Sequence, residues 1–125
     1  MRVEPPVSAT YRGYEVYTCG PWCQGPLTPQ TLNILEQFDV AAMGHNSPEY
    51  LHVLTEALKL GFADRHAYYG DPNHVDVPIE GLLSKEYARA RAGQISQRAA
   101  PEMPPPGDPW AYQSGRGLVG AAAAV

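Results

Sequence analysis

The chain has 125 residues, of which 44% are hydrophobic and 18% are charged, with a formal net charge of −4. A chain of this length forms one domain that buries about two thirds of its unfolded surface. The charge pattern contains no clustered basic patch, and no apolar run approaches the roughly 20 residues that span a bilayer. No nucleic-acid or membrane partner is therefore predicted. The first ten residues lack a positive-then-apolar export signal, and localisation stays open.

Residues 7–18, VSATYRGYEVYT, predict two short antiparallel strands on either side of Arg12 and Gly13. Polar and apolar side chains alternate over residues 14–18, which is the period of a strand with two unlike faces. The following residues, CGPWCQGP at 19–26, contain glycines and prolines throughout and predict a loop.

A short amphipathic helix is predicted over residues 28–40, TPQTLNILEQFDV. Thr28 followed by Pro29 is typical of a helix start, with threonine as the N-cap. Leucine and phenylalanine side chains then recur at helical spacing. Gly44 is expected to end this element.

The longest predicted element is a helix that starts with Ser47 as N-cap and Pro48 at the first position. Gly70 is expected to end it. Its circumference is mostly apolar, so neighbouring elements should bury it. Gly61 in its interior suggests that another backbone packs closely there. A narrow polar stripe contains Glu56 and Lys59 one turn apart, together with His52 and Thr55.

A polar loop over residues 71–81 should lead to a third helix, SKEYARARAGQI at 84–95, with Ser84 as its N-cap. Tyr87, Ala90 and Ile95 are expected to face inward. The predicted fold class is therefore α+β and mostly helical, a short β-hairpin followed by three helices.

Many of the 13 prolines lie between residues 101 and 109. Such a segment cannot hold regular hydrogen-bonded structure and predicts an extended linker. The ordered core is placed at residues 7–95. The chain is divided into a folded part, 1–100, and a Pro-rich linker with a Gly/Ala-rich disordered tail, 101–125.

Cys19 and Cys23 are the chain's two cysteines, spaced C-x3-C. A zinc site would need two further ligands. A disulfide is possible but cramped across a Gly-Pro turn, and two ordinary thiols are the favoured interpretation.

The loop residues Asp71, Asn73, His74 and Asp76 offer several oxygens and one imidazole. The calcium-loop pattern needs Gly at its sixth place and Glu at its twelfth, and this loop has Asp76 and Leu82 there. A solvated or capping role is predicted instead.

His52 and Glu56 lie one turn apart without the HExxH pattern of a metalloprotease, and the other histidines, His45, His66 and His74, are scattered. No nucleophile elbow and no phosphate-binding glycine loop is present. No catalytic, cofactor-binding or metal-ligating residue is therefore assigned, and no cofactor is predicted.

Taken in order, YRGYEVYT, QGP, LNILEQFD, SPEYLHVLTEALKLGFADRHAYYGDP and LLSKEYARAR resemble the gamma-glutamyltransferase family over about residues 4–95. EALKLGFADRHAYYGDP is the most specific part. The resemblance implies the C-terminal part of a large subunit, a fragment of an N-terminal-nucleophile hydrolase with an αββα fold. It also implies a precursor that cuts itself, exposing a threonine that attacks γ-glutamyl or related amides.

That threonine should follow shortly after the Pro-rich segment, yet no threonine follows Thr55. The resemblance therefore implies an incomplete enzyme, inactive alone, whose partners are the rest of the large subunit and the small subunit. The parent substrate would be a glutathione-like γ-glutamyl amide. The alternative is a non-catalytic helical module that associates with a separately encoded remainder of the fold.

Overall fold

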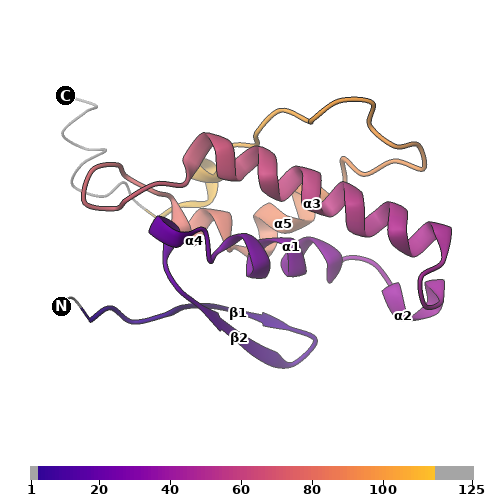
Figure 1. Cartoon of the computed structure of the whole chain (residues 1–125), viewed down its shortest axis with the longest axis horizontal. Helices are drawn as coiled ribbons and strands as arrows, with labels where there is room; N and C mark the ends of the chain where they lie inside the picture. The colour runs from indigo at the N-terminus through magenta and orange to yellow at the C-terminus, as the bar shows by residue number, and fades with distance from the viewer. Residues whose placement is uncertain (1–2, 115–125) are drawn as a thin grey trace.

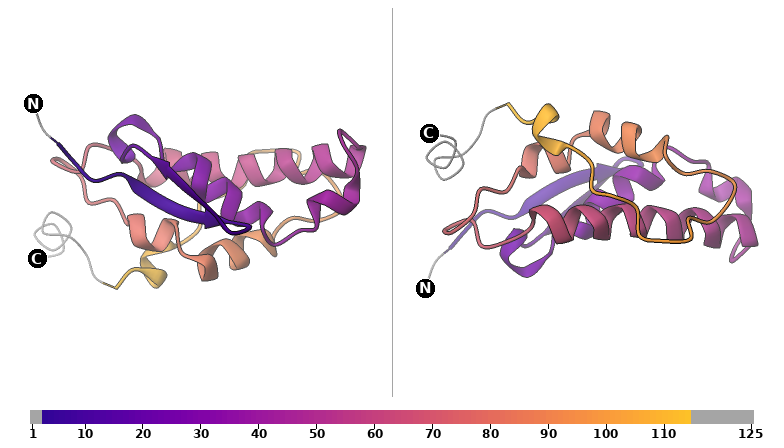
Figure 2. Two further views of the ribbon diagram at one scale, coloured as in Figure 1. Left: turned by 90° about the horizontal axis from the view of Figure 1, so that it is seen from below. Right: turned by 90° about the horizontal axis from the view of Figure 1, so that it is seen from above.

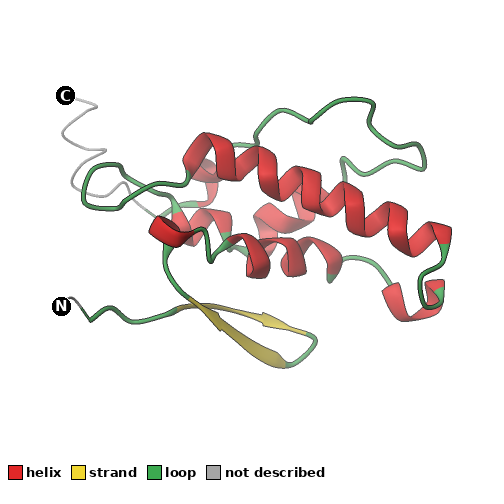
Figure 3. Cartoon of the chain, viewed as in Figure 1, coloured by secondary structure: helices red, strands yellow, loops and turns green. Residues whose placement is uncertain are grey.

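The computed structural model describes residues 3–114 and consists of one β-hairpin and several helices, as Figures 1 and 3 show. This arrangement confirms the predicted fold class. The strands are β1 (Val7–Tyr11) and β2 (Tyr14–Thr18). The α-helices are α1 (Leu27–Leu35), α2 (Val40–Met43), α3 (Pro48–Tyr68), α4 (Ile79–Leu82) and α5 (Lys85–Ala92). Two 3-10 turns are η1 (Pro21–Cys23) and η2 (Pro109–Tyr112).

The hairpin turns tightly at Arg12 and Gly13, which have φ angles of 48° and 87°. Two consecutive positive φ values are typical of a type I′ turn, whose twist matches that of the strands. The antiparallel register pairs Tyr11 with Tyr14. The Arg12 amide donates to Glu36 Oε2 over 2.8 Å, and this bond is the main reason that the pKa of Glu36 is lowered. The turn is thereby held against the residue that follows α1.

Helix α1 lies at the centre of the molecule and contacts β1, α3 and α5 (Figure 2). Its start was predicted wrongly, because the helix begins at Leu27 and Thr28 lies inside it. The amides of Leu27 and Thr28 donate to the carbonyls of Gln24 and Gly25 in the preceding turn. Since the backbone already provides these acceptors, no threonine N-cap is needed.

The segment after α1 was predicted as a continuation of the helix to residue 40, but α1 ends at Leu35. A separate short helix, α2, starts after Asp39, whose carboxylate accepts from the Ala42 amide over 3.3 Å. Gly44 ends α2 with a φ of 87°, and not the helix predicted over residues 28–40.

The start of α3 is confirmed, because Ser47 Oγ accepts from the Tyr50 amide over 3.1 Å and Pro48 is the first helical residue. The helix ends at Tyr68 rather than at Gly70. Tyr69 already has an extended backbone, with φ −78° and ψ 143°. The chain thus leaves the helix without a left-handed glycine.

At Gly61, α3 packs tightly against α1. A Cβ atom there would lie 2.9 Å from Leu27 Cδ1 and 3.0 Å from Thr31 Oγ1. The prediction that another backbone packs against Gly61 was wrong, because side chains of α1 make this tight contact.

Replacement of Gly61 by valine should separate these two helices. We expect Gly61→Val to lower the free energy of unfolding by about 1–3 kcal/mol, because a branched side chain overfills the contact. Urea unfolding followed by circular dichroism measures this. Gly93→Ala is the matched control, since its Cβ would come no closer than 3.4 Å to the nearest oxygen. Equal stability of the two variants would contradict the prediction.

Helix α5 starts as predicted, with Ser84 Oγ accepting from the Tyr87 amide over 3.0 Å. Tyr87 is buried and Ile95 packs against the core, but Ala90 is exposed. The inward face is made by residues 87, 88, 91 and 92. Successive residues turn by about 100°, so Ala90 lies well outside this face. The prediction for Ala90 was therefore wrong.

The single-turn helix α4 was missed, because residues 71–81 were predicted as a loop. The hydrophobic core lies between α1, α3 and α5. The buried members of the core are Ile34, Leu35, Val53, Ala57, Leu60, Ala88 and Ala92. Lys85 ties the hairpin to this core, because its ammonium group binds the Thr10 carbonyl, Asn33 Oδ1 over 2.7 Å and Glu36 Oε1 over 3.0 Å.

Candidate functional site

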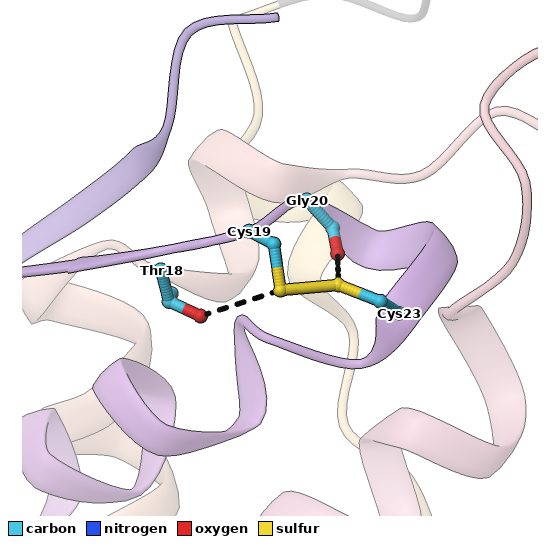
Figure 4. The surroundings of a disulfide bond; sticks show 4 residues. All are labelled: Thr18, Cys19, Gly20 and Cys23. Carbon is cyan, nitrogen blue, oxygen red and sulfur yellow. Dashed lines mark hydrogen bonds between the residues drawn. A yellow bond between two sulfur atoms is a disulfide. The ribbon is translucent and has the colours of Figure 1, made fainter.

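Cys19 and Cys23 form a disulfide, with Cα atoms 6.6 Å apart (Figure 4). The favoured interpretation of two free thiols was wrong. The turn η1 folds the intervening residues back, and the Cys23 amide donates to the Gly20 carbonyl over 3.3 Å. Gly25 permits the next turn, since a Cβ there would overlap the Cys19 carbonyl oxygen and lie 2.9 Å from Cys19 Sγ.

Reduction of this disulfide should destabilise the fold by about 2 kcal/mol, the chain-entropy value for so short a loop. Urea unfolding with and without dithiothreitol measures the difference. Alkylation followed by mass spectrometry checks the redox state, and the unreduced chain should take up no alkyl group. The Cys19→Ser/Cys23→Ser variant controls for reductant, because its stability should be the same in both buffers. Alkylation of either cysteine in the unreduced chain would contradict the presence of the disulfide.

An open groove of about 780 Å³ lies beside the disulfide. The N-terminal residues, the end of β2, the turn η1 and the loop after α3 line it. Trp22 and Tyr17 on its walls are exposed at 60% and 59% of their surface. The described residues lining it include no histidine, lysine or arginine that could activate a hydroxyl group. The groove therefore presents aromatic surface beside the disulfide.

The loop residues Asp71, Asn73 and His74 contact one another. Asp71 Oδ1 accepts from the Asn73 amide over 2.9 Å, which is the capping role predicted for the loop. His74 Nε2 lies 3.8 Å from Asp71 Oδ2, with both side chains exposed. Within residues 3–114, no group of three or more His, Cys, Asp or Glu side chains could hold a metal ion.

His52 and Glu56 belong to a polar stripe on α3 that binds the C-terminal part of the chain. His52 Nε2 lies 2.7 Å from the Ser96 carbonyl oxygen. One turn further, Glu56 Oε2 accepts from the Ala100 amide over 3.3 Å, and Lys59 donates to the Ala100 carbonyl over 2.9 Å. Lys59 and Glu56 also form an ion pair at 2.7 Å. Burial alone would raise the pKa of Glu56, but these bonds lower it overall.

A separate polar contact on α3 is made by Asp64, a fully buried carboxylate that lies outside this stripe. Asp64 Oδ2 accepts from Gln30 Nε2 of α1 over 2.7 Å and from the Tyr87 hydroxyl of α5 over 2.8 Å. Its Oδ1 accepts from Arg91 Nη2 over 3.1 Å and from the Gly107 amide over 2.9 Å. One carboxylate thus joins three helices and the Pro-rich segment.

Arg91 neutralises Asp64 and is itself 2% exposed. Its Nη2 also donates to the carbonyls of Leu60 and Pro105, each over 3.2 Å. A buried carboxylate is stable only with such charge-assisted partners. Burial raises the pKa of the neighbouring Tyr87 hydroxyl, and the charge of Asp64 raises it further.

The Asp64 network holds parts of the chain together and contains no reactive pair. Both carboxylate oxygens are occupied by donors, and the Tyr87 proton is committed to Asp64. Sequence reasoning missed the network, although an aspartate inside a mostly apolar helix was a signal for it.

No helix among residues 3–114 is long and apolar enough to cross a membrane.

Solved structures with this fold are much longer chains. The gamma-glutamyltranspeptidase of Helicobacter pylori matches with a TM-score of 0.75 and 32% identity, over 81% of this chain and 30% of that one. The cephalosporin acylase of Bacillus halodurans matches with a TM-score of 0.74 and 35% identity, over 83% of this chain and 19% of that one. The class of protein is therefore that of N-terminal-nucleophile hydrolases, and the chain has part of their fold.

The particular family follows from the sequence comparisons. The gamma-glutamyltranspeptidase family model matches residues 1–121, and the chain belongs to this family. The glutathione hydrolase-like YwrD proenzyme of Bacillus subtilis is 49% identical over 108 residues, covering 86% of this chain and 21% of that protein. The glutathione hydrolase proenzyme of Escherichia coli is 44% identical over 91 residues, covering 72% of this chain and 16% of that protein. The chain spans about a fifth of the length of these relatives.

Proposed function

We propose that the chain is the C-terminal part of the large subunit of a gamma-glutamyltransferase-type amide hydrolase and is inactive by itself. The observation that carries this proposal is the family match over residues 1–121 combined with coverage of about a fifth of each relative. The absence of any threonine after Thr55 supports it, because the family's nucleophile is a threonine. The partners would be the remainder of the large subunit and the small subunit.

In the complete enzyme the chemistry would require groups that lie outside these residues. The threonine hydroxyl attacks the amide carbonyl while its own α-amino group takes up the proton. The amide C–N bond breaks, the amine leaves with a proton, and the acyl group passes to water or to an acceptor amine. The substrate class is a γ-glutamyl amide resembling glutathione. No described residue of this chain is assigned a catalytic, cofactor-binding or metal-binding role.

The contribution of this chain to such an enzyme is structural. Its helices α1, α3 and α5 enclose the Asp64 network, and this network holds the Pro-rich segment in place. In the family pattern the nucleophile follows that segment.

The division at residue 100 into a folded part and a linker stays a prediction, and the tail at 115–125 lies outside the described residues.

A γ-glutamyl anilide assay tests the proposal. The purified chain is expected to release no anilide above buffer, even at high protein concentration, because it has no nucleophile of the family type. A complete family enzyme is the positive control. Turnover that co-purifies with the chain and survives removal of contaminants would contradict the proposal.

A second candidate function is a non-catalytic helical module that binds a separately encoded remainder of the fold. The exposed leucines of α3 favour it, since Leu51 is 47% exposed and Leu58 37% exposed. Exposed apolar surface of this kind is typical of interaction sites. Size-exclusion chromatography separates the two candidates. A defined dimer favours the module, whereas aggregation favours the incomplete enzyme.

A further inference from the structure

Residues 105–114, which we define as the strap, are bound to the helices at several points. The strap runs beside α3 and then reaches α4, as the right view of Figure 2 shows. The strap begins at the Asp64 network, where the Pro105 carbonyl accepts from Arg91 and the Gly107 amide donates to Asp64. The Tyr68 hydroxyl donates to the Gly107 carbonyl over 2.5 Å.

Two glycines make this path possible because no side chain would fit at either position. A Cβ on Gly107 would overlap the Tyr87 hydroxyl and lie 3.0 Å from Arg91 Cδ. A Cβ on Gly81 in α4 would overlap the Pro109 carbonyl oxygen and lie 3.4 Å from the Gln113 amide nitrogen. Close backbone approach is a role that only glycine can fill.

The end of the strap is bound to α4 by further hydrogen bonds. The Gly81 amide donates to Gln113 Oε1 over 2.8 Å. The Ser114 hydroxyl donates to Glu80 Oε2 over 2.6 Å. Pro109 is buried, and the Tyr112 ring lies 5.4 Å from that of Tyr87. The position of residue 114 on the helices is thus fixed by contacts at several points.

We infer that Gly81, Gly107 and Asp64 are positioning residues that hold the strap on the helices. In the precursor, the docked strap then determines where the following segment, which carries the threonine nucleophile, begins. This inference rests on the proposed function, which places that threonine shortly after the strap. A docked strap restricts the positions of the residues that follow it, so the peptide bond to be cut is held in one place. A free linker would allow these residues many positions and would slow self-cleavage.

Hydrogen exchange on this chain tests the docking itself. In Gly81→Ala we expect the amides of residues 110–114 to exchange at least about tenfold faster through local opening, while the α3 amides keep their rates. Gly93→Ala is the matched control and should change neither. Because Gly81→Ala could disturb α4 itself, Gln113→Ala is measured as well, and it should also speed exchange of the Gly81 amide. Unchanged exchange at residues 110–114 in both variants would overturn the inference.

The positioning role is tested in a chimera in which residues 1–114 replace the matching segment of the Bacillus subtilis proenzyme. We expect Gly81→Ala to slow appearance of the two subunits on a gel by about tenfold or more, with Gly93→Ala unchanged. Equal cleavage of Gly81→Ala and wild type would overturn the positioning role. A wild-type chimera that does not cleave would count against the proposed function, while the exchange experiment still decides whether the strap is docked.

Discussion

Replacement of Asp64 by alanine should destabilise the chain by about 3–5 kcal/mol, since it leaves Arg91 buried without its counter-ion. Arg91 is 2% exposed and cannot turn outward to water. The same change removes the acceptor for Gln30, Tyr87 and the Gly107 amide. Domains have about 5–15 kcal/mol of stability in total, so this loss is a large fraction of what holds the fold together. Urea unfolding followed by circular dichroism measures the loss.

Two further variants separate the ion pair from simple loss of a carboxylate. Asp71→Ala removes an exposed aspartate and should change stability by less than about 1 kcal/mol. Asp64→Ala/Arg91→Met removes both charges, and its loss should be smaller than the sum of the two single losses by at least about 1 kcal/mol. A loss below about 1 kcal/mol in Asp64→Ala would show that the network does not hold the fold together.

Stability should fall steeply above pH 10, because burial raises the pKa of Tyr87 and the nearby charge of Asp64 raises it further. In the unfolded chain tyrosine ionises near pH 10, so above this pH the folded state holds a proton that the unfolded state has lost. The Tyr87 contribution is thus fully present below pH 10. It decreases by about 1.4 kcal/mol for each further pH unit. Burial also raises the pKa of Tyr69, which adds to the same trend.

Urea midpoints at pH 8 and pH 11 measure this slope. Tyr87→Phe should be less stable than the wild type at pH 8, because it lacks the hydrogen bond to Asp64. Between pH 8 and pH 11 it should lose less stability than the wild type loses. Tyr14→Phe is the control, since Tyr14 is 75% exposed, and it should follow the wild type at both pH values. Lysines ionise in the same range, but they are common to all three proteins. Identical slopes for Tyr87→Phe and wild type would contradict the prediction.

Several local elements could be predicted from the sequence because their determinants are neighbours in the chain. Ser47 and Ser84 cap their helices through amides three residues away. Gly13 supplies one of the two positive φ angles that the hairpin turn requires. Thr28 failed as a cap because the backbone of the preceding turn had already provided the acceptors. The disulfide was missed for a similar reason, since the η1 turn that joins Cys19 to Cys23 could not be read from spacing alone.

The sequence by itself determined the family, the α+β class, the two capped helices and the lack of any threonine after Thr55. Only the tertiary structure decided what the polar side chains of α3 do. His52, Glu56 and Asp64 bind residues more than 40 positions away, at Ser96, Ala100 and Gly107. No local pattern encodes which distant backbone will meet a polar side chain. In the folded chain, the stripe residues His52 and Glu56 therefore bind the segment at residues 96–100, and Asp64 binds the strap.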